Sequence, residues 1–184
     1  DIQDLLKATK ENPGKIKMAG LGFGTIDDIT LRYLASKGHR MTLVPNPNPG
    51  ERYASVLGGH NEVLYEQAGD IKQYLDAKQL KPVLVFAEKR VPAFPDVPCS
   101  KELGFEVYLP QFRCIVAKKG VAPEHVKTLT AALEKGMHTP EWKKFNDEQY
   151  ANPDSYMGGD QFRDWVAGEM KHMEKFMKEF GIIK

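Results

Sequence analysis

Apolar side chains in the first half of the chain alternate between helical spacing and short continuous runs. Ile26, Ile29 and Tyr33, for example, follow one another at the three- and four-residue spacing of a helix face. This spacing predicts helices over residues 1–11, 25–37, 51–57 and 69–77. The short apolar runs predict strands over residues 15–19, 40–44, 62–65 and 82–86. Because strands and helices alternate, we expect an α/β domain with a mostly parallel sheet flanked by helices.

The second half of the chain is expected to be mainly helical. A proline-rich connector at 91–98 leads to one or two strands within 105–117. Helical spacing then covers 123–138, a segment that starts at Thr139, and 159–180. The apolar residues of the last helix form one stripe, which suits either a partner helix or, as the preferred interpretation, packing in the core. The stripe consists of Phe162, Trp165, Val166, Met173, Phe176, Met177 and Phe180.

Length and composition exclude several classes of protein. With 184 residues, the chain forms one domain or two small lobes. Its 26 basic and 25 acidic side chains give a net charge of +1, which argues against a nucleic-acid-binding protein. No apolar run approaches the length of a membrane-spanning helix. The first residues show no signal-peptide pattern, which is also expected of an exported protein after processing.

Ligands of open parallel sheets bind beyond the carboxyl ends of the strands. Here these ends predict three candidate loops, Gly20–Thr25, Pro45–Pro49 and Glu66–Gly69. The glycines of the first loop allow backbone N–H groups to approach a ligand, and the start of the following helix favours an anion. The alternating prolines between Pro45 and Gly50 predict an extended, rigid loop.

Two interpretations are open for the acids that follow the glycine loop. With Thr25 as the N-cap of the helix, Asp28 lies close to the position that completes a capping box. Alternatively, Asp27 and Asp28 contact an amino or hydroxyl group of a ligand from the first turn of the helix. The cap is the preferred interpretation.

The sequence contains no recognisable catalytic or metal-binding set. The glycine loop has GxGxG spacing instead of the GxGxxG of dinucleotide-binding turns, so a Rossmann-like nucleotide-binding enzyme is the less favoured alternative. The five histidines lack metal-ligand spacing, and no cofactor is predicted. Cys99 and Cys114 form either a disulfide or two separate thiols. We therefore expect a binding protein and not an enzyme.

Several short motifs follow one another in the order that is found in one family of binding proteins. They are Asn12-Pro13-Gly14-Lys15, Gly22-Phe23-Gly24-Thr25, Val44-Pro45, Leu57-Gly58-Gly59, Glu88-Lys89-Arg90, Phe94-Pro95-Asp96-Val97-Pro98 and Glu102-Leu103-Gly104-Phe105-Glu106. Each motif is short, but together they run along nearly the whole chain. The sequence resembles the substrate-binding proteins of tripartite tricarboxylate transporters, the TctC or Bug type.

The resemblance implies a two-lobed, periplasmic-binding-protein-like fold of type II with a periplasmic location. In this family the lobes close over a small carboxylated ligand, which is then delivered to the integral-membrane permease subunits of an uptake transporter. A ligand sensor that presents its closed form to a signalling receptor is the alternative on the same fold.

The resemblance also implies a set of ligand contacts. Thr25 replaces the usual serine of the glycine loop and keeps a hydroxyl group. Asp28 stands where a histidine is common and Asn46 where a tyrosine is common, and an acid at residue 28 disfavours a second carboxylate nearby. The complete set of predicted ligand-binding residues is Gly20, Gly22, Phe23, Gly24, Thr25, Asp28, Pro45, Asn46, Glu66, Gln67 and Arg113.

The motifs match only the later part of the family members. This implies that residues 1–110 form the complete second lobe and residues 111–184 the returning, mainly helical part of the first lobe, which is incomplete in this chain. Arg113 lies where the chain crosses between the lobes, as either a carboxylate partner of the ligand or a structural salt bridge. Uncovered sheet edges and apolar helix faces predict a fragment, or a separate N-terminal segment that completes the first lobe.

Overall fold

A three-stranded parallel sheet forms the centre of the molecule in the computed structural model, which describes residues 1–152 and 156–184. The central strand is β1 (Lys17–Gly20), with β2 (Thr42–Pro45) on one side and β3 (Val63–Leu64) on the other. In this register Gly20 pairs with Pro45, so the carboxyl ends of β1 and β2 lie at the same level. The prediction of a parallel sheet flanked by helices is confirmed.

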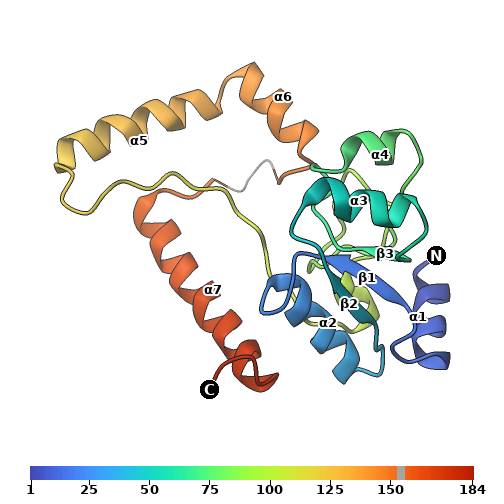
Figure 1. Cartoon of the computed structure of the whole chain (residues 1–184). Coiled ribbons are helices and arrows are strands. Elements are labelled where there is room, and N and C mark those ends of the chain that lie inside the picture. Colours follow the sequence, from blue (N-terminus) through green and yellow to red (C-terminus); the bar gives the residue numbers. More distant parts are fainter. Residues whose placement is uncertain (153–155) are drawn as a thin grey trace.

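Four helices of the first half surround this sheet, close to where the sequence predicts them. Successive strands are added on opposite sides of β1, so right-handed crossovers place α2 and α3 on opposite faces (Figure 1). Side-chain caps set two of the helix starts, because Asp1 accepts from the N–H of Gln3 and Asn48 accepts from the N–H of Gly50. The helices are α1 (Ile2–Glu11), α2 (Ile26–Ser36), α3 (Pro49–Leu57) and α4 (Lys72–Asp76).

The loop after β2 is shorter than the alternating prolines predict. Pro49 and Gly50 belong to the first turn of α3, so the prediction that the whole of Pro45–Gly50 is extended is wrong. A proline at the first helical position is tolerated because its missing N–H would have no partner within the helix.

The second half of the chain is helical, as predicted. Figure 1 shows α5 and α6 extending away from the sheet, whereas α7 runs back so that its C-terminal end lies beside α2. A short 3-10 helix, η1, precedes this half. The elements are η1 (Ser100–Leu103), α5 (Pro123–Met137), α6 (Pro140–Glu148) and α7 (Gly159–Glu179).

Two predicted strands do not form in the described part of the chain. Within 82–86 only Val85 makes a bridge, to Cys99, and within 105–117 no ladder is present. Side chains in the second segment do alternate at first, since Phe105 and Val107 are buried and Glu106 is exposed. An alternating pattern becomes a strand only where a neighbouring strand accepts and donates its backbone hydrogen bonds. No described strand lies along 105–117, so the segment is extended but unpaired.

The main core joins both halves of the chain. Residues of α2, of the segment 105–109 and of α7 pack into one cluster, and Phe176 of α7 meets the ring of Tyr33 edge-to-face at 5.9 Å. The interpretation of the α7 stripe as core packing is therefore confirmed for its C-terminal half. The buried members of the cluster are Ile29, Tyr33, Leu34, Phe105, Val107, Leu109 and Phe176.

We predict that acidification destabilises the docking of α1 through His39. This side chain is buried, and its Nδ1 lies 3.0 Å from Thr9 Oγ1 and 3.2 Å from the carbonyl oxygen of Leu6, both on α1. Burial, helped by the positive charge of Lys10, lowers the pKa of His39 below its ordinary value of 6.5. The unfolded chain therefore binds this proton more readily, and stability is lost as the pH falls through 6.5.

Urea unfolding at pH 7.5 and pH 5.5 measures this effect. The free energy of unfolding should be lower at the acidic pH, and the difference should shrink in His39→Leu. The exposed His60 supplies the control, because His60→Gln should keep the full pH dependence. An equal pH dependence in His39→Leu and the unmodified protein would assign the effect to another group.

Candidate functional site

The three predicted loops lie together at the carboxyl edge of the sheet. The chain proceeds from β1 to one side and then to the other, which makes the carboxyl end of β1 a topological switch point. Backbone bonds hold the other loops to β1: the N–H of Asn46 donates to the carbonyl oxygen of Gly20 at 2.8 Å, and the N–H of Tyr65 to that of Ala19 at 3.1 Å. The structure thus brings the starts of all three loops to one place.

Side chains at the end of the glycine loop form hydrogen bonds with the backbone of the loop. Thr25 Oγ1 donates to the carbonyl oxygen of Gly22 at 2.6 Å, and Gly24 adopts the left-handed conformation at φ 74°. Thr25 stands at the N-cap of α2, but its side chain makes no capping bond because the hydroxyl is used within the loop. The predicted capping box is therefore wrong, and Asp28 Oδ2 accepts instead from the N–H of Gly24 at 2.9 Å.

Both acids after the loop are buried and accept from loop amides. Asp27 Oδ2 accepts from the N–H of Leu21 at 2.5 Å; burial raises the pKa of Asp27, and this hydrogen bond partly opposes the shift. Asp28 Oδ1 accepts from Arg32 Nε at 2.9 Å, so its carboxylate joins the loop to the next turn of α2. Two amides of the loop thus already have protein acceptors, and one of them belongs to Gly24, a predicted ligand-binding residue.

Three other amides of the loop are candidate donors to a ligand. The N–H groups of Gly22, Phe23 and Thr25 have no acceptor among the residues that the structure describes. The Phe23 side chain of the same loop is 70% exposed, which is unusual for a phenylalanine. The loop therefore offers amide donors beside an apolar ring at the start of α2.

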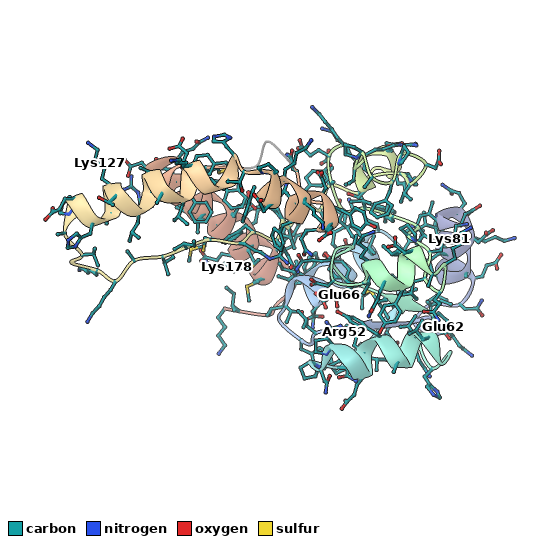
Figure 2. The ribbon with its side chains drawn as sticks, turned by 90° about the horizontal axis from the view of Figure 1, so that it is seen from above. Arg52, Glu62, Glu66, Lys81, Lys127 and Lys178 are labelled. Atoms are coloured by element: carbon teal, nitrogen blue, oxygen red, sulfur yellow. The ribbon has the colours of Figure 1, made fainter. Side chains whose placement is uncertain are left out.

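Arg52 is the residue of this edge that sequence reasoning missed. It lies on α3, its side chain is 3% exposed, and that of its partner Glu66 is 9% exposed. Arg52 Nε and Nη2 donate to Glu66 Oε2 at 3.1 and 2.5 Å, and Nη1 donates to the carbonyl oxygen of Asn46 at 2.8 Å. Figure 2 shows Arg52 and Glu66 meeting between α3 and the loop after β3. No local sequence signal distinguishes Arg52 from the other basic residues of the chain.

Arg113 is held beside the loop after β3. Its Nη2 lies 3.7 Å from Asp70 Oδ1 and donates to Gln149 Oε1 at 3.1 Å. Nearby, Gln67 Nε2 donates to the side-chain oxygen of Gln111. These contacts bring residues 111–113 next to the strand ends. The guanidinium is more than half exposed, so a ligand contact by Arg113 stays a prediction alongside the observed salt bridge.

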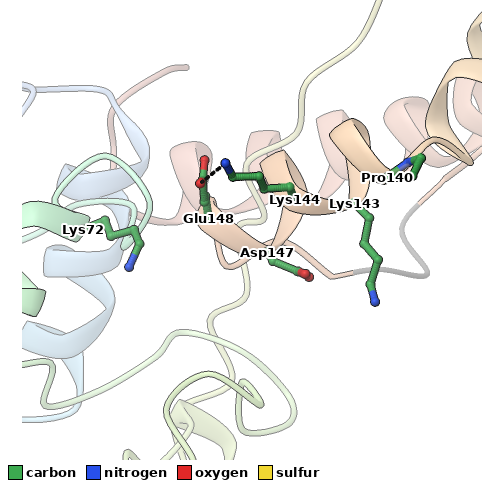
Figure 3. Close-up of a pocket in the computed structure, with 6 residues that line it drawn as sticks. All are labelled: Lys72, Pro140, Lys143, Lys144, Asp147 and Glu148. Atoms are coloured by element: carbon green, nitrogen blue, oxygen red, sulfur yellow. Dashed lines mark ion pairs between the residues drawn. The ribbon is translucent and has the colours of Figure 1, made fainter.

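A cavity of about 420 Å³ lies elsewhere, between the start of α4 and α6 (Figure 3). Its lining is mostly charged, and Lys144 pairs with Glu148 across one side of it at 4.0 Å. None of the predicted ligand-binding residues lines this cavity, so we assign no function to it. The lining residues are Lys72, Pro140, Lys143, Lys144, Asp147 and Glu148.

Other kinds of site find no support in the described part of the chain. Residues 1–152 and 156–184 contain no group of three or more side chains that could hold a metal ion. They also include no helix long and apolar enough to cross a membrane. Cys99 is buried and Cys114 is exposed, and both are free thiols, so the structure favours the second of the two interpretations.

The comparisons with known proteins agree on one family. The sequence model of the tripartite tricarboxylate transporter family receptor, TctC, matches residues 1–182. A protein of Cupriavidus necator, "UPF0065 protein in gbd 5'region", is 29% identical over 188 residues, which cover 100% of this chain and 56% of that protein. Protein BugT of Bordetella pertussis is 22% identical and covers 98% of this chain and 56% of its own length. The chain thus spans about half the length of these curated relatives.

Solved structures show the same fold. A TctC solute-binding protein from Polaromonas, solved without ligand, superposes with a TM-score of 0.73 at 23% identity, covering 97% of this chain and 61% of its own. The periplasmic binding protein BugD gives a TM-score of 0.71 at 20% identity, with coverages of 98% and 61%. The predicted periplasmic-binding-protein fold is therefore confirmed for the part that this chain supplies.

Proposed function

Because this chain belongs to the tripartite tricarboxylate transporter receptor family, we propose that it is a periplasmic solute-binding protein that captures a small carboxylated metabolite for an uptake transporter of that type. The observation that supports this most is the glycine loop at the switch point of the sheet. There, the amides of Gly22, Phe23 and Thr25 lack acceptors among the described residues and lie just before the start of α2.

The loop suits one carboxylate of a ligand. The free loop amides donate to its oxygens, and the dipole of α2 adds about 0.3–1 kcal/mol for an anion at the first turn. Asp27 and Asp28 accept from the neighbouring loop amides of Leu21 and Gly24, so a second negative charge at the same place is disfavoured. We propose that a further carboxylate, where the ligand has one, binds away from this loop, with Arg113 as a candidate partner.

The proposed partners are the permease subunits of the transporter and a segment that completes the first lobe. Support for the segment that completes the first lobe comes from apolar side chains that are exposed in the described part of the chain. Ile115 and Val116 are 75% and 80% exposed on an unpaired extended segment, which a neighbouring strand would cover. Further exposed apolar residues on α5 and α6 are Val126, Leu129, Leu133, Trp142 and Phe145.

Native mass spectrometry followed by calorimetry tests the proposed function. The native spectrum reports any co-purifying segment and any bound acid, and titration with acetate, succinate and citrate then compares one, two and three carboxylates. We expect saturable binding of at least one acid, strengthened when the first lobe is completed. A well-folded chain of 20.7 kDa that carries no partner and binds none of the acids would contradict the proposal.

We predict that Thr25→Val weakens binding of the acid found in this screen by about threefold to tenfold, as expected for one lost hydrogen bond. The variant removes the bond from Thr25 Oγ1 to the Gly22 carbonyl oxygen, which sets the shape of the loop. Thr25→Ser keeps the hydroxyl and should bind normally. Calorimetry measures both affinities, and equal affinity in all three proteins would remove Thr25 from the site.

A further inference from the structure

The buried ion pair between Arg52 and Glu66 does more than join α3 to the sheet. We infer that Arg52 and Glu66 form a positioning pair, which holds the loops after β2 and β3 in the arrangement that captures the ligand. The inference rests on the proposed function for its purpose, but its geometry and its principal test are independent of any ligand.

One guanidinium reaches both loops at once. Arg52 Nη1 donates to the backbone carbonyl of Asn46 at 2.8 Å, while Nε and Nη2 donate to Glu66 Oε2. Glu66 extends the connection, because its Oε1 accepts from the N–H of Gln67 at 3.1 Å. Backbone atoms of Asn46 and Gln67, two of the predicted ligand-binding residues, thus bond to the two members of one buried pair, Asn46 to Arg52 and Gln67 to Glu66.

Stability alone is a weak reason for such a pair. Taking two charges out of water costs several kcal/mol per ion, and replacing a buried pair with apolar residues of similar volume is often neutral or stabilising. The side-chain bonds of Arg52 go to the Asn46 carbonyl in the loop after β2 and to the Glu66 carboxylate in the loop after β3, and none of them is needed to form α3 itself. What the planar fork of arginine supplies is a fixed geometry among three groups.

The surroundings of the pair extend the same connection. Burial and the nearby Glu66 carboxylate raise the pKa of Tyr53 to about 12, so its hydroxyl stays protonated beside Glu66. The ring of Tyr53 packs on Tyr74 at 5.8 Å, which joins α4 to this edge. Glu66 of the loop after β3 therefore contacts Arg52 and Tyr53 of α3, and Tyr53 in turn contacts α4.

Hydrogen exchange in the double variant Arg52→Leu/Glu66→Leu tests the inference. NMR should follow the amides of Asn46 and Tyr65, which donate to β1 carbonyls and make no bond to the pair, so their exchange reports how firmly each loop is docked. We expect both to exchange about tenfold faster or more, while the thermal midpoint and the exchange of α2 amides change little.

Two further variants sharpen the test. Arg52→Lys keeps a charge for Glu66 but lacks the fork, so Asn46 should exchange faster while Tyr65 keeps its protection. The matched control is Arg90→Leu/Glu102→Leu, a second arginine–glutamate pair in which Arg90 also donates to a backbone carbonyl, that of Pro95, at 2.8 Å. This control should leave Asn46 and Tyr65 unchanged.

The outcomes separate the inference from the proposed function. Unchanged exchange at Asn46 and Tyr65 in the double variant, or a rise spread evenly over the sheet and α2, overturns the positioning role. If acetate, succinate or citrate binds the unmodified protein, the double variant should bind that acid about tenfold more weakly at the same thermal midpoint; equal affinity also overturns the inference. Failure of the unmodified protein to bind any of the three acids counts against the proposed function and leaves the exchange result standing.

Discussion

Phe176→Ala is expected to lower the free energy of unfolding by about 3–5 kcal/mol, the usual cost of emptying a buried phenylalanine site. Phe176 is 7% exposed although it lies on α7, more than 130 residues after the helix it packs against. Its ring meets Tyr33 of α2 at 5.9 Å and stacks on Phe180 at 6.0 Å. The variant leaves a cavity at the point where the two halves of the chain share a core.

Denaturant unfolding followed by circular dichroism measures this loss. Met170→Ala is the matched control, because Met170 lies on the same helix but is 68% exposed, and its truncation should change stability by no more than about 0.5 kcal/mol. Equal losses in the two variants would mean that α7 does not pack against α2 in solution. A loss confined to Phe176→Ala would establish that contact.

Arg52→Leu alone is expected to cost about 3–5 kcal/mol, in contrast to the small change predicted for the double variant. The single substitution removes the only guanidinium that contacts Glu66 in the described structure, and the Glu66 side chain is 9% exposed. An uncompensated carboxylate in that position must stay buried and charged, take up a proton, or pull the loop into water. Each of these costs free energy that the paired state avoids.

Thermal unfolding of the single and double variants measures the difference. Adding Glu66→Leu to Arg52→Leu should restore most of the lost stability, because the second substitution removes the stranded charge. Arg90→Leu supplies the control: the Arg90 side chain is 46% exposed, so its loss should be much smaller. A single variant as stable as the double variant would mean that water already reaches Glu66.

Local signals in the sequence were sufficient for much of the architecture. Helical spacing located α1, α2, α5 and α7, because apolar residues three and four positions apart form one face of a helix. The alternation of strands and helices gave the parallel sheet, and the glycines after β1 marked the loop at its carboxyl edge. The order of short motifs along the chain pointed to the family. Each of these signals is read from residues that are close together in the sequence, and the family from the order in which such short segments follow one another.

Other features depended on which distant segments meet. The runs at 82–86 and 105–117 have the composition of strands, but only a neighbouring strand can complete a ladder, and the described chain supplies none for them. From the sequence, Asp27 and Asp28 were expected either to cap the helix or to contact a ligand. In the folded loop their carboxylates instead accept hydrogen bonds from amides of the loop itself.

Arg52 is the clearest case. In the sequence it is one basic residue of 26, indistinguishable from those that face solvent. Its role appears only when the crossover from β2 to β3 lays α3 over the sheet and brings Glu66 and the carbonyl of Asn46 within reach of one guanidinium. Spacing along the chain determines which face of a helix is apolar, but the partner of a buried charge is decided by the tertiary structure, because the partner comes from another strand end.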